Sequence, residues 1–206
     1  MFNPKRIIIL IITLISIFLY YPVNRFISGG VELKFFFDDF IPIVPVFIIP
    51  YLIGTILFII FPIFVFIKIR DKRFYSYSIT IIIASIISVL IYFIYPTYVS
   101  RVDVTGVDIF SNLLKWLYSN DNMYNAIPSG HTFYTFIMYL YLQKWFPKYK
   151  YIFAVIAFLI IISTQFTGQH NIIDMIVGLL FGYGCYSAQR LLPNSVQNAA
   201  KLEEKK

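Results

Sequence analysis

The chain is organised around the stretch IPSGHT, residues 127–132, which opens a long apolar run. Pro128 suits the first turn of a helix, because the N–H that proline lacks would have no partner there. Ser129 and Gly130 then leave backbone N–H groups free at the N-terminus of that helix, and such a terminus is a ready binding site for an anion. His131 comes next, so the stretch places a titratable side chain beside a predicted anion site.

A second stretch, GQHNIID at residues 168–174, opens another apolar run and holds the second of the two histidines. His170 and Asp174 are four positions apart, so on a helix they share one face and can touch. A carboxylate in that position fixes the imidazole tautomer and raises its basicity. Each histidine by itself could be a structural residue at the membrane interface, but two of them at the starts of apolar runs predict a site. An anion site, two histidines and an orienting carboxylate together favour phosphoryl transfer.

The composition places the chain among integral membrane proteins. Of its 206 residues, 59% are hydrophobic and 13% are charged, whereas soluble domains carry roughly 25% charged residues. The net charge of +7 does not indicate nucleic-acid binding, because the basic residues form short clusters between apolar runs. The single cysteine, Cys185, excludes an internal disulfide and is expected to serve packing only.

Six apolar runs predict an all-α, polytopic membrane bundle with six transmembrane helices. They span residues 7–21, 41–67, 74–95, 128–145, 151–166 and 172–186. The first run is short enough for a signal peptide, but no small-residue cleavage site follows it, so a first membrane span is favoured. Pro50 and Pro62 are expected to kink the second run. Residues 109–118, in the longest polar segment, could form a short helix on the surface.

The lysine and arginine residues predict the orientation of this bundle. Basic clusters lie at residues 1–6, 68–73, 144–150 and 201–206. All four clusters are expected in the cytoplasm, because positive charge favours that side. This orientation gathers Arg101, His131 and His170 on the extracytoplasmic side. We therefore expect one membrane domain over residues 1–192, a cytoplasmic tail over residues 193–206, both termini in the cytoplasm, and a place in the cell (plasma) membrane.

These residues resemble the motifs of the type 2 phosphatidic acid phosphatase superfamily. The sequence PSGH at 128–131 matches its second motif, and residues 163–174 are similar to its third motif, S-R-x5-H-x3-D. Arg101 is the best match to the arginine of the first motif, K-x6-R-P. PSGH alone is a weak match, but an H-x3-D segment 39 positions further on (170 − 131) makes the combination specific. The resemblance covers about residues 90–190, which would form the catalytic core of a lipid phosphatase-like bundle.

The resemblance also implies a catalytic role for three residues. The histidine that matches His170 attacks phosphorus and forms a phosphohistidine, and the aspartate that matches Asp174 orients it. The histidine that matches His131 protonates the leaving oxygen. The resemblance implies no metal and no cofactor, since cationic side chains and backbone amides can stabilise the developing charge.

The phosphate ligands that the resemblance implies are incomplete in this chain. Arg101 and the backbone at Ser129 and Gly130 would hold the phosphoryl oxygens. Ile94 stands where the family has lysine, Thr164 stands where the third motif has arginine, and Val102 replaces the proline of the first motif.

Neutral side chains could partly replace these missing cations. Thr164 could donate a hydrogen bond to phosphate, or it could instead donate to the carbonyl one helical turn back. Tyr124, Asn125 and Gln169 are further neutral donors, and such bonds are weaker than charge-assisted ones. Tyr124 and Asn125 could equally brace the loop in which they lie.

The implied function is that of an integral membrane lipid phosphatase, which hydrolyses a phosphomonoester or pyrophosphate of the phosphatidic acid or polyprenyl diphosphate type. A related branch, with the inositol phosphorylceramide and sphingomyelin synthases, also lacks the third-motif arginine, so head-group transfer to an alcohol is an alternative. A second alternative is a non-catalytic lipid-binding membrane protein, because two of the three cationic ligands are missing. The expected partner is a membrane lipid in the bilayer and not a nucleic acid, and the sequence leaves the oligomeric state open.

Overall fold

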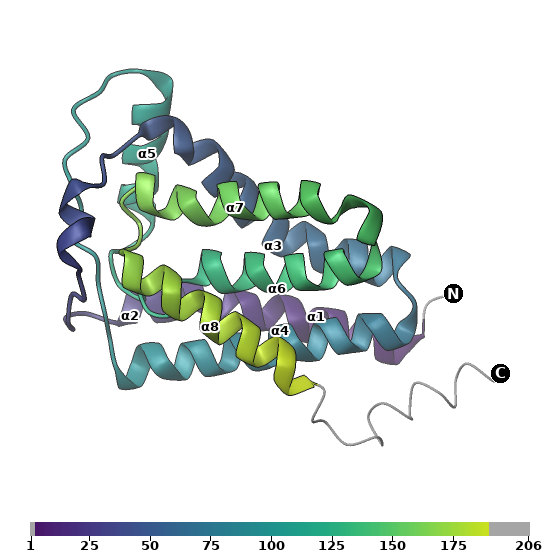
Figure 1. The fold of residues 1–206 in the computed structure, drawn as a ribbon. Helices are drawn as coiled ribbons and strands as arrows, with labels where there is room; N and C mark the ends of the chain where they lie inside the picture. The colour runs from purple at the N-terminus through teal and green to yellow at the C-terminus, as the bar shows by residue number, and fades with distance from the viewer. Residues whose placement is uncertain (1–2, 190–206) are drawn as a thin grey trace.

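The structure is a computed structural model that describes residues 3–189 as a bundle of helices (Figure 1). The helices are α1 (Pro4–Phe18), α2 (Tyr20–Phe26), α3 (Ile48–Lys68), α4 (Asp71–Ile94), α5 (Ile109–Asn120), α6 (Gly130–Trp145), α7 (Lys150–Phe166) and α8 (Ile172–Ala188). Short 3-10 turns are η1 (Phe36–Phe40), η2 (Pro45–Phe47) and η3 (Pro147–Tyr149). Within the described residues β-structure is limited to two isolated bridges, Val31–Thr97 and Tyr98–Tyr124. The predicted all-α membrane bundle is confirmed.

Four helical stretches are long and apolar enough to cross a membrane. They are Pro4–Phe26, Pro45–Lys68, Asp71–Ile94 and Pro147–Phe166. The apolar helix α8 is shorter, and α6 packs against α3, α4, α7 and α8 in the middle of the bundle. The number of six spans and the single domain over residues 1–192 remain predictions, and the predicted tail over residues 193–206 lies outside the described residues.

Two helix boundaries differ from the sequence-based expectation. The first membrane helix does not end at Tyr21; after a break at Leu19 it continues as α2 to Phe26. Pro50 does not kink the second run, because α3 begins at Ile48 and Pro50 lies in its first turn, where proline removes no helical hydrogen bond. The expected surface helix is present as α5, and Asp108 caps its N-terminus.

Helix α6 begins two residues later than its proline predicts. Ser129 is the N-cap, with its side-chain oxygen accepting a hydrogen bond from the backbone N–H of Thr132, and Gly130 is the first helical residue. Pro128 therefore precedes the helix. A cap of this kind fixes the direction in which the chain enters the helix.

Small residues on α8 allow it to approach α6 closely. A Cβ atom added at Gly178 would lie 2.9 Å from the Thr132 Cβ, and one added at Gly182 would lie 3.1 Å from the Phe133 carbonyl oxygen. Close packing of this kind is typical of membrane helices that meet at small residues. Because α6 and α8 meet near their N-termini, the stretches 127–132 and 168–174 become neighbours, and the Ser129 N–H donates to the Asp174 carbonyl at 3.3 Å.

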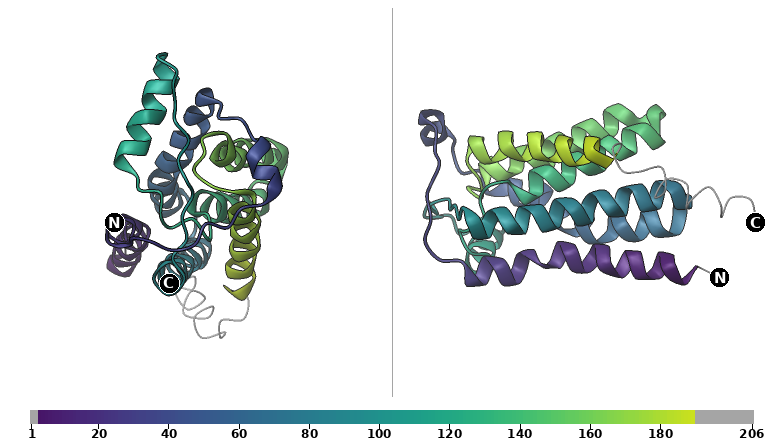
Figure 2. Two further views of the ribbon diagram at one scale, coloured as in Figure 1. Left: turned by 90° about the vertical axis from the view of Figure 1, so that its left-hand side faces the viewer. Right: turned by 90° about the horizontal axis from the view of Figure 1, so that it is seen from below.

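The loops that carry the motifs gather at one end of the bundle. The start of α1, the end of α8 and the turns from α3 to α4 and from α6 to α7 lie at the opposite end (Figure 2, right). At that opposite end Arg6 is 8% exposed and forms an ion pair with Asp71. It also donates to the carbonyl oxygens of Phe66 and Ile69, both at 2.5 Å. These contacts join the start of α1 to the turn between α3 and α4.

Candidate active site

His170 lies in the turn that joins α7 to α8. Gly168 permits this turn with a φ of +60°, and a Cβ there would lie 2.7 Å from the Tyr118 hydroxyl oxygen. The backbone N–H groups of Gln169 and His170 both donate to the carbonyl of Thr164, at 2.9 and 3.2 Å. Thr164 therefore supports the backbone that carries His170.

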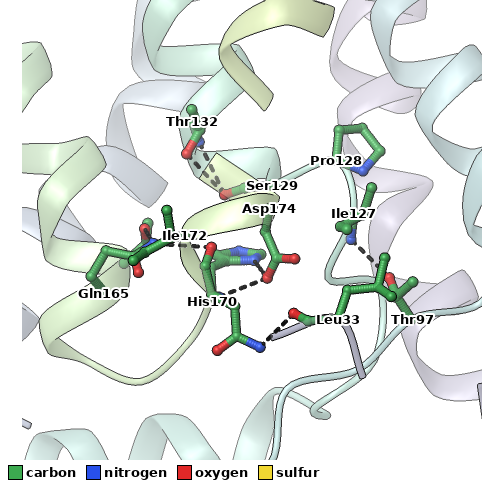
Figure 3. Close-up of polar contacts among 12 residues, drawn as sticks. Leu33, Thr97, Ile127, Pro128, Ser129, Thr132, Gln165, His170, Ile172 and Asp174 are labelled. Carbon is green, nitrogen blue, oxygen red and sulfur yellow. Dashed lines mark hydrogen bonds and ion pairs between the residues drawn. The ribbon is translucent and has the colours of Figure 1, made fainter. Parts of the chain in front are cut away.

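Asp174 lies behind the His170 ring (Figure 3). The distance from His170 Nδ1 to Asp174 Oδ2 is 3.4 Å, and the aspartate is 1% exposed. The same oxygen accepts a hydrogen bond from the backbone N–H of Asn171 at 2.8 Å, which fixes the carboxylate. Nδ1 faces Asp174 without a hydrogen bond at this distance among the described residues, and Nε2 is the ring nitrogen on the far side from the carboxylate.

The first turn of α6 carries His131, and α3 holds its ring. Thr55 Oγ1 lies 2.9 Å from His131 Nε2. The ring stacks on Tyr51 with 3.9 Å between centroids, and Phe58 contacts its edge with 5.0 Å between centroids. A Cβ at Gly54 would make only an ordinary contact with His131 Cδ2, at 3.4 Å, but would lie 2.6 Å from Ile160 Cγ2, so glycine there lets α3 approach α7. These α3 contacts were not predicted; the signal available was Thr55 as a rare polar residue in an apolar run.

Arg101 joins the loops on two sides of the site. Its guanidinium donates to the carbonyl of Gly168 at 3.1 Å and to that of Asn122 at 3.3 Å. It also lies over the ring of Tyr118, with 4.6 Å from Cζ to the centroid. Its Nε atom has no hydrogen-bond partner among residues 3–189.

One cavity of about 190 Å³ brings most of the predicted site residues together. Those that line it are Arg101, Tyr124, Asn125, Gly130, His131 and His170. Apolar side chains from α1 and α3, among them Ile17, Phe18, Leu52 and Phe58, line the same cavity. The cavity is therefore polar where the motifs meet and apolar between α1 and α3.

Three predicted site residues do not line this cavity. Asp174 lies behind His170, as described above. Ser129 is fully buried, and its Oγ accepts a hydrogen bond from the Thr132 hydroxyl at 3.0 Å. The Thr164 hydroxyl donates to the Ile161 carbonyl at 2.7 Å, so it makes the alternative bond one turn back.

Ile94 and Val102, which stand where the family has lysine and proline, are exposed. Ile94 is 81% exposed at the end of α4, and Val102 is 54% exposed. Neither side chain lines the cavity.

Two buried amide side chains in the cavity wall retain unused hydrogen-bonding capacity. Asn125 is 2% exposed and Gln169 is 5% exposed. Neither atom of the Asn125 amide, nor Nε2 of Gln169, has a hydrogen-bond partner among the described residues. Buried polar atoms are normally paired, so such atoms call for an explanation, and a ligand in the cavity is one. Asn125 has a φ of +65°, a conformation that asparagine tolerates better than most residues.

Asp121 is a further cavity residue that the sequence did not single out as part of the site. It follows α5, and its Oδ1 accepts a hydrogen bond from the Tyr20 hydroxyl at 3.0 Å. Burial raises the pKa of the Asp121 carboxyl above its ordinary value, and the charge of Arg101, the Tyr20 bond and the charge of His170 partly offset this. Among residues 3–189, no three or more His, Cys, Asp or Glu side chains form a group that could hold a metal ion.

The helix that carries Asp174 also has an acidic partner from a distant loop. The carboxylate of Asp38, in η1, accepts a hydrogen bond from the backbone N–H of Ile172 at 2.7 Å. The side-chain amide of Asn171 donates to the Leu33 carbonyl at 2.9 Å (Figure 3). The loop between α2 and α3 is thereby attached to the two residues that follow His170.

Comparisons with known proteins identify the family of the chain. The family model of the PAP2 superfamily matches residues 33–188, a range that includes Arg101 and both histidine stretches. An uncharacterized protein of Methanocaldococcus jannaschii is 34% identical over 84 residues, which cover 41% of this chain and 34% of that protein. The match thus spans about a third of that relative's length. No solved structure matches the chain. Since the family model covers most of its length, the chain belongs to the PAP2 superfamily, a phosphatase-type family of lipid enzymes.

Proposed function

We propose that the protein is an integral membrane lipid phosphatase that hydrolyses a phosphomonoester or pyrophosphate of a lipid through a phosphohistidine at His170. The observation that carries this proposal is the shared cavity of His131, His170 and Arg101, with Asp174 behind His170. These residues come from segments far apart in the sequence. Structural histidines alone would give no reason for them to meet at one cavity beside a cation.

In the first step, His170 Nε2 attacks phosphorus, a bond from nitrogen to phosphorus forms, and the bond from phosphorus to the lipid oxygen breaks. His131 donates a proton to that oxygen, and acid assistance of this kind contributes roughly 10²–10⁴-fold in rate. Asp174 stabilises the positive charge that develops on the His170 ring. In the second step, the water oxygen attacks phosphorus and His131 takes a proton from the water. The bond from phosphorus to His170 Nε2 breaks, its electron pair returns to the ring, and phosphate leaves.

The phosphate oxygens would be held by one cation and several neutral donors. Arg101 supplies the positive charge, and the start of α6 at Gly130 supplies a helix N-terminus that favours an anion. The unpaired amide nitrogens of Asn125 and Gln169 support this arrangement. These donors would serve where Ile94 and Thr164 offer no charge, and the chemistry proposed needs no metal ion or cofactor.

The proposed substrate is a lipid phosphate or pyrophosphate, of the phosphatidic acid or polyprenyl diphosphate type, that reaches the cavity from the bilayer. The apolar side chains of α1 and α3 in the cavity wall support this, because they suit a hydrocarbon chain. We also propose that the motif end of the bundle faces the extracytoplasmic side of the cell membrane, with both termini in the cytoplasm. The basic clusters of the sequence support this orientation.

A head-group phosphotransferase of the inositol phosphorylceramide or sphingomyelin synthase type is the second candidate. It would use the same first step, and an alcohol would then replace water as the acceptor. The replacement of cationic ligands by neutral amides at the cavity favours it, because the related transferase branch also lacks the third-motif arginine.

The test is phosphate release by the purified full chain from a panel of lipid phosphates and pyrophosphates. His170→Ala should abolish release, and Tyr183→Ala, an exposed position on α8, should leave it unchanged and serve as the matched control. A new lipid phosphodiester in the presence of a head-group donor and an alcohol would favour the transferase instead. Activity that survives His170→Ala would exclude the proposed nucleophile. Lipid binding without any turnover would leave the non-catalytic alternative.

A further inference from the structure

Asp121 is a carboxylate of the cavity wall for which the proposed reaction has no use. Its backbone N–H donates to the Leu117 carbonyl at 2.9 Å, so α5 fixes its place. The Tyr20 hydroxyl donates to its Oδ1 at 3.0 Å. Asn24 donates in turn to the Tyr20 oxygen at 3.3 Å and accepts a hydrogen bond from the backbone N–H of Asn122 at 3.0 Å. The carboxylate is therefore held by α2 and α5.

The part of α2 that holds Asp121 lies outside residues 33–188, the range that the family model matches. Tyr20 and Asn24 both belong to that part. The arrangement around Asp121 is therefore a feature of this chain beyond the matched core.

No basic side chain among residues 3–189 forms an ion pair with Asp121. Arg101 is near, but its guanidinium donates to the backbone carbonyl of Asp121 at 3.5 Å rather than to the carboxylate. The second carboxylate oxygen, Oδ2, accepts no hydrogen bond from the described residues. The Asp121 side chain is partly buried in the cavity wall, so Oδ2 can accept a hydrogen bond from a ligand in the cavity. A hydrogen bond to a charged acceptor contributes more than one between neutral groups.

The surrounding charges favour a neutral donor over a cationic one. The positive charge of Arg101 acts on Asp121 and would repel an ammonium group brought to the same place. We propose that Asp121 binds a hydroxyl group close to the phosphorus in space. This hydroxyl belongs to the substrate head group or to the alcohol acceptor. The inference rests on the proposed function, since it assumes that a phosphoester occupies this cavity.

The test compares three small phosphonates that cannot be cleaved: butylphosphonate, 3,4-dihydroxybutylphosphonate and 3-aminopropylphosphonate. Their affinities for the full chain in detergent are measured by calorimetry. We expect the dihydroxy compound to bind about 10-fold more tightly than butylphosphonate, as for one hydrogen bond to a charged acceptor. In Asp121→Ala this ratio should fall to about 1. The affinity for butylphosphonate itself should rise, because a negative charge beside Arg101 is lost. Asn120→Ala, an exposed neighbour in the cavity wall, should keep the ratio.

Equal affinities in the wild type, a ratio that survives in Asp121→Ala, or tightest binding of the amino compound would each overturn the inference. If Asp121→Ala does not fold, Asp121→Asn decides, because it keeps the size of the side chain and must still lower the ratio. Absence of binding by the dihydroxy compound also overturns the inference. Cleavage of a lipid phosphate by the same preparation then shows whether the proposed function stands without it.

Discussion

Arg6 and Arg101 join segments at opposite ends of the bundle through similar contacts. Each guanidinium donates to backbone carbonyls and lies over an aromatic ring. Arg6 also forms an ion pair with Asp71, whereas Arg101 forms none among the described residues and lines the cavity. The charge of Arg6 is thus neutralised within the fold, whereas Arg101, which is only partly buried, has no ion-pair partner among the described residues. The comparison teaches that a carboxylate partner and deeper burial together mark the structural arginine, and that the lack of both supports the role proposed for Arg101.

Neutral polar side chains can be compared in the same way. Away from the cavity, the Tyr141 hydroxyl lies 3.0 Å from Ser76 Oγ and 2.8 Å from Thr80 Oγ1, so these side chains satisfy one another. In the cavity wall, the amides of Asn125 and Gln169 have atoms without partners in the described part of the chain. The hydroxyls of Ser78 on α4 and Thr135 on α6 also have no partner among the described residues, and neither residue lines the cavity. A missing partner therefore supports a ligand site only where the atom also faces a cavity.

Asp174→Asn should produce the largest effect at the cavity end. The amide would favour the wrong tautomer of His170, and turnover of the lipid phosphate should fall by about 10⁴-fold, the effect of such a change on an orienting aspartate. Steady-state phosphate release measures this. A fall of less than tenfold would contradict the role given to Asp174.

His131→Ala should lower turnover by about 10³-fold, because the leaving oxygen would lose its acid. Thermal unfolding in detergent should be nearly unchanged. Thr55→Val, which removes only the hydroxyl beside His131 Nε2, is the matched control and should retain most of the activity. Loss of folded protein in His131→Ala would show that this histidine serves the structure instead.

Arg101→Met and Arg6→Met should give opposite results. Loss of the hydrogen bonds and charge at Arg101 should weaken binding of a phosphate analogue by about 10- to 100-fold, with a small effect on stability. Arg6→Met should lower the free energy of unfolding by about 2 kcal/mol, less than for a fully buried pair, because the Asp71 side chain is 39% exposed. Activity per folded molecule should stay normal in Arg6→Met. Equal effects of both substitutions on activity would contradict the different roles given to Arg6 and Arg101.

Gln169→Ala should give the smallest effect. We expect about a 5- to 10-fold loss of affinity for a phosphate analogue, because one hydrogen bond from a neutral donor is lost. Its stability should not fall, because the Nε2 atom that it removes has no partner in the fold. Gln165→Ala is the contrasting variant, since the Gln165 amide donates to the Asn171 carbonyl at 3.2 Å and its loss should destabilise the protein. If Gln169→Ala is less stable but keeps full affinity for the phosphate analogue, Gln169 serves the structure and not ligand binding.

The sequence predicted the parts of the fold that depend on local pattern. Apolar runs predicted the helices, because a segment of the right length and composition can satisfy its backbone only as a helix in a membrane. The four-residue spacing of His170 and Asp174 predicted that they would touch on one helix face. They do lie close, but His170 is in the turn before α8, so the turn and the cap at Asn171 bring them together. The extension to Phe26 and the place of Pro50 were missed because single residues rarely fix a helix boundary.

The walls of the cavity could not be predicted from the same patterns. Contacts of His131 with Tyr51 and Thr55 depend on how α3 packs beside α6, and hydrophobicity does not encode that choice. The pairing of Asp121 with Tyr20 joins residues 101 positions apart. The hydroxyl of Thr164 illustrates a competition between a ligand and a backbone carbonyl, which the residue type leaves open.

The close contact of α6 and α8 makes Gly178 a point at which the reaction distance can be tuned. An alanine there would place its methyl carbon 2.9 Å from the Thr132 Cβ, so the two helices would have to separate slightly. The histidine-bearing turns lie at the ends of these helices and would move with them. Displacements of about 1 Å can change enzymatic rates about 100-fold. A protein engineer could therefore use alanine and serine at Gly178 as graded spacers and adjust the gap between His170 and His131 without altering either side chain.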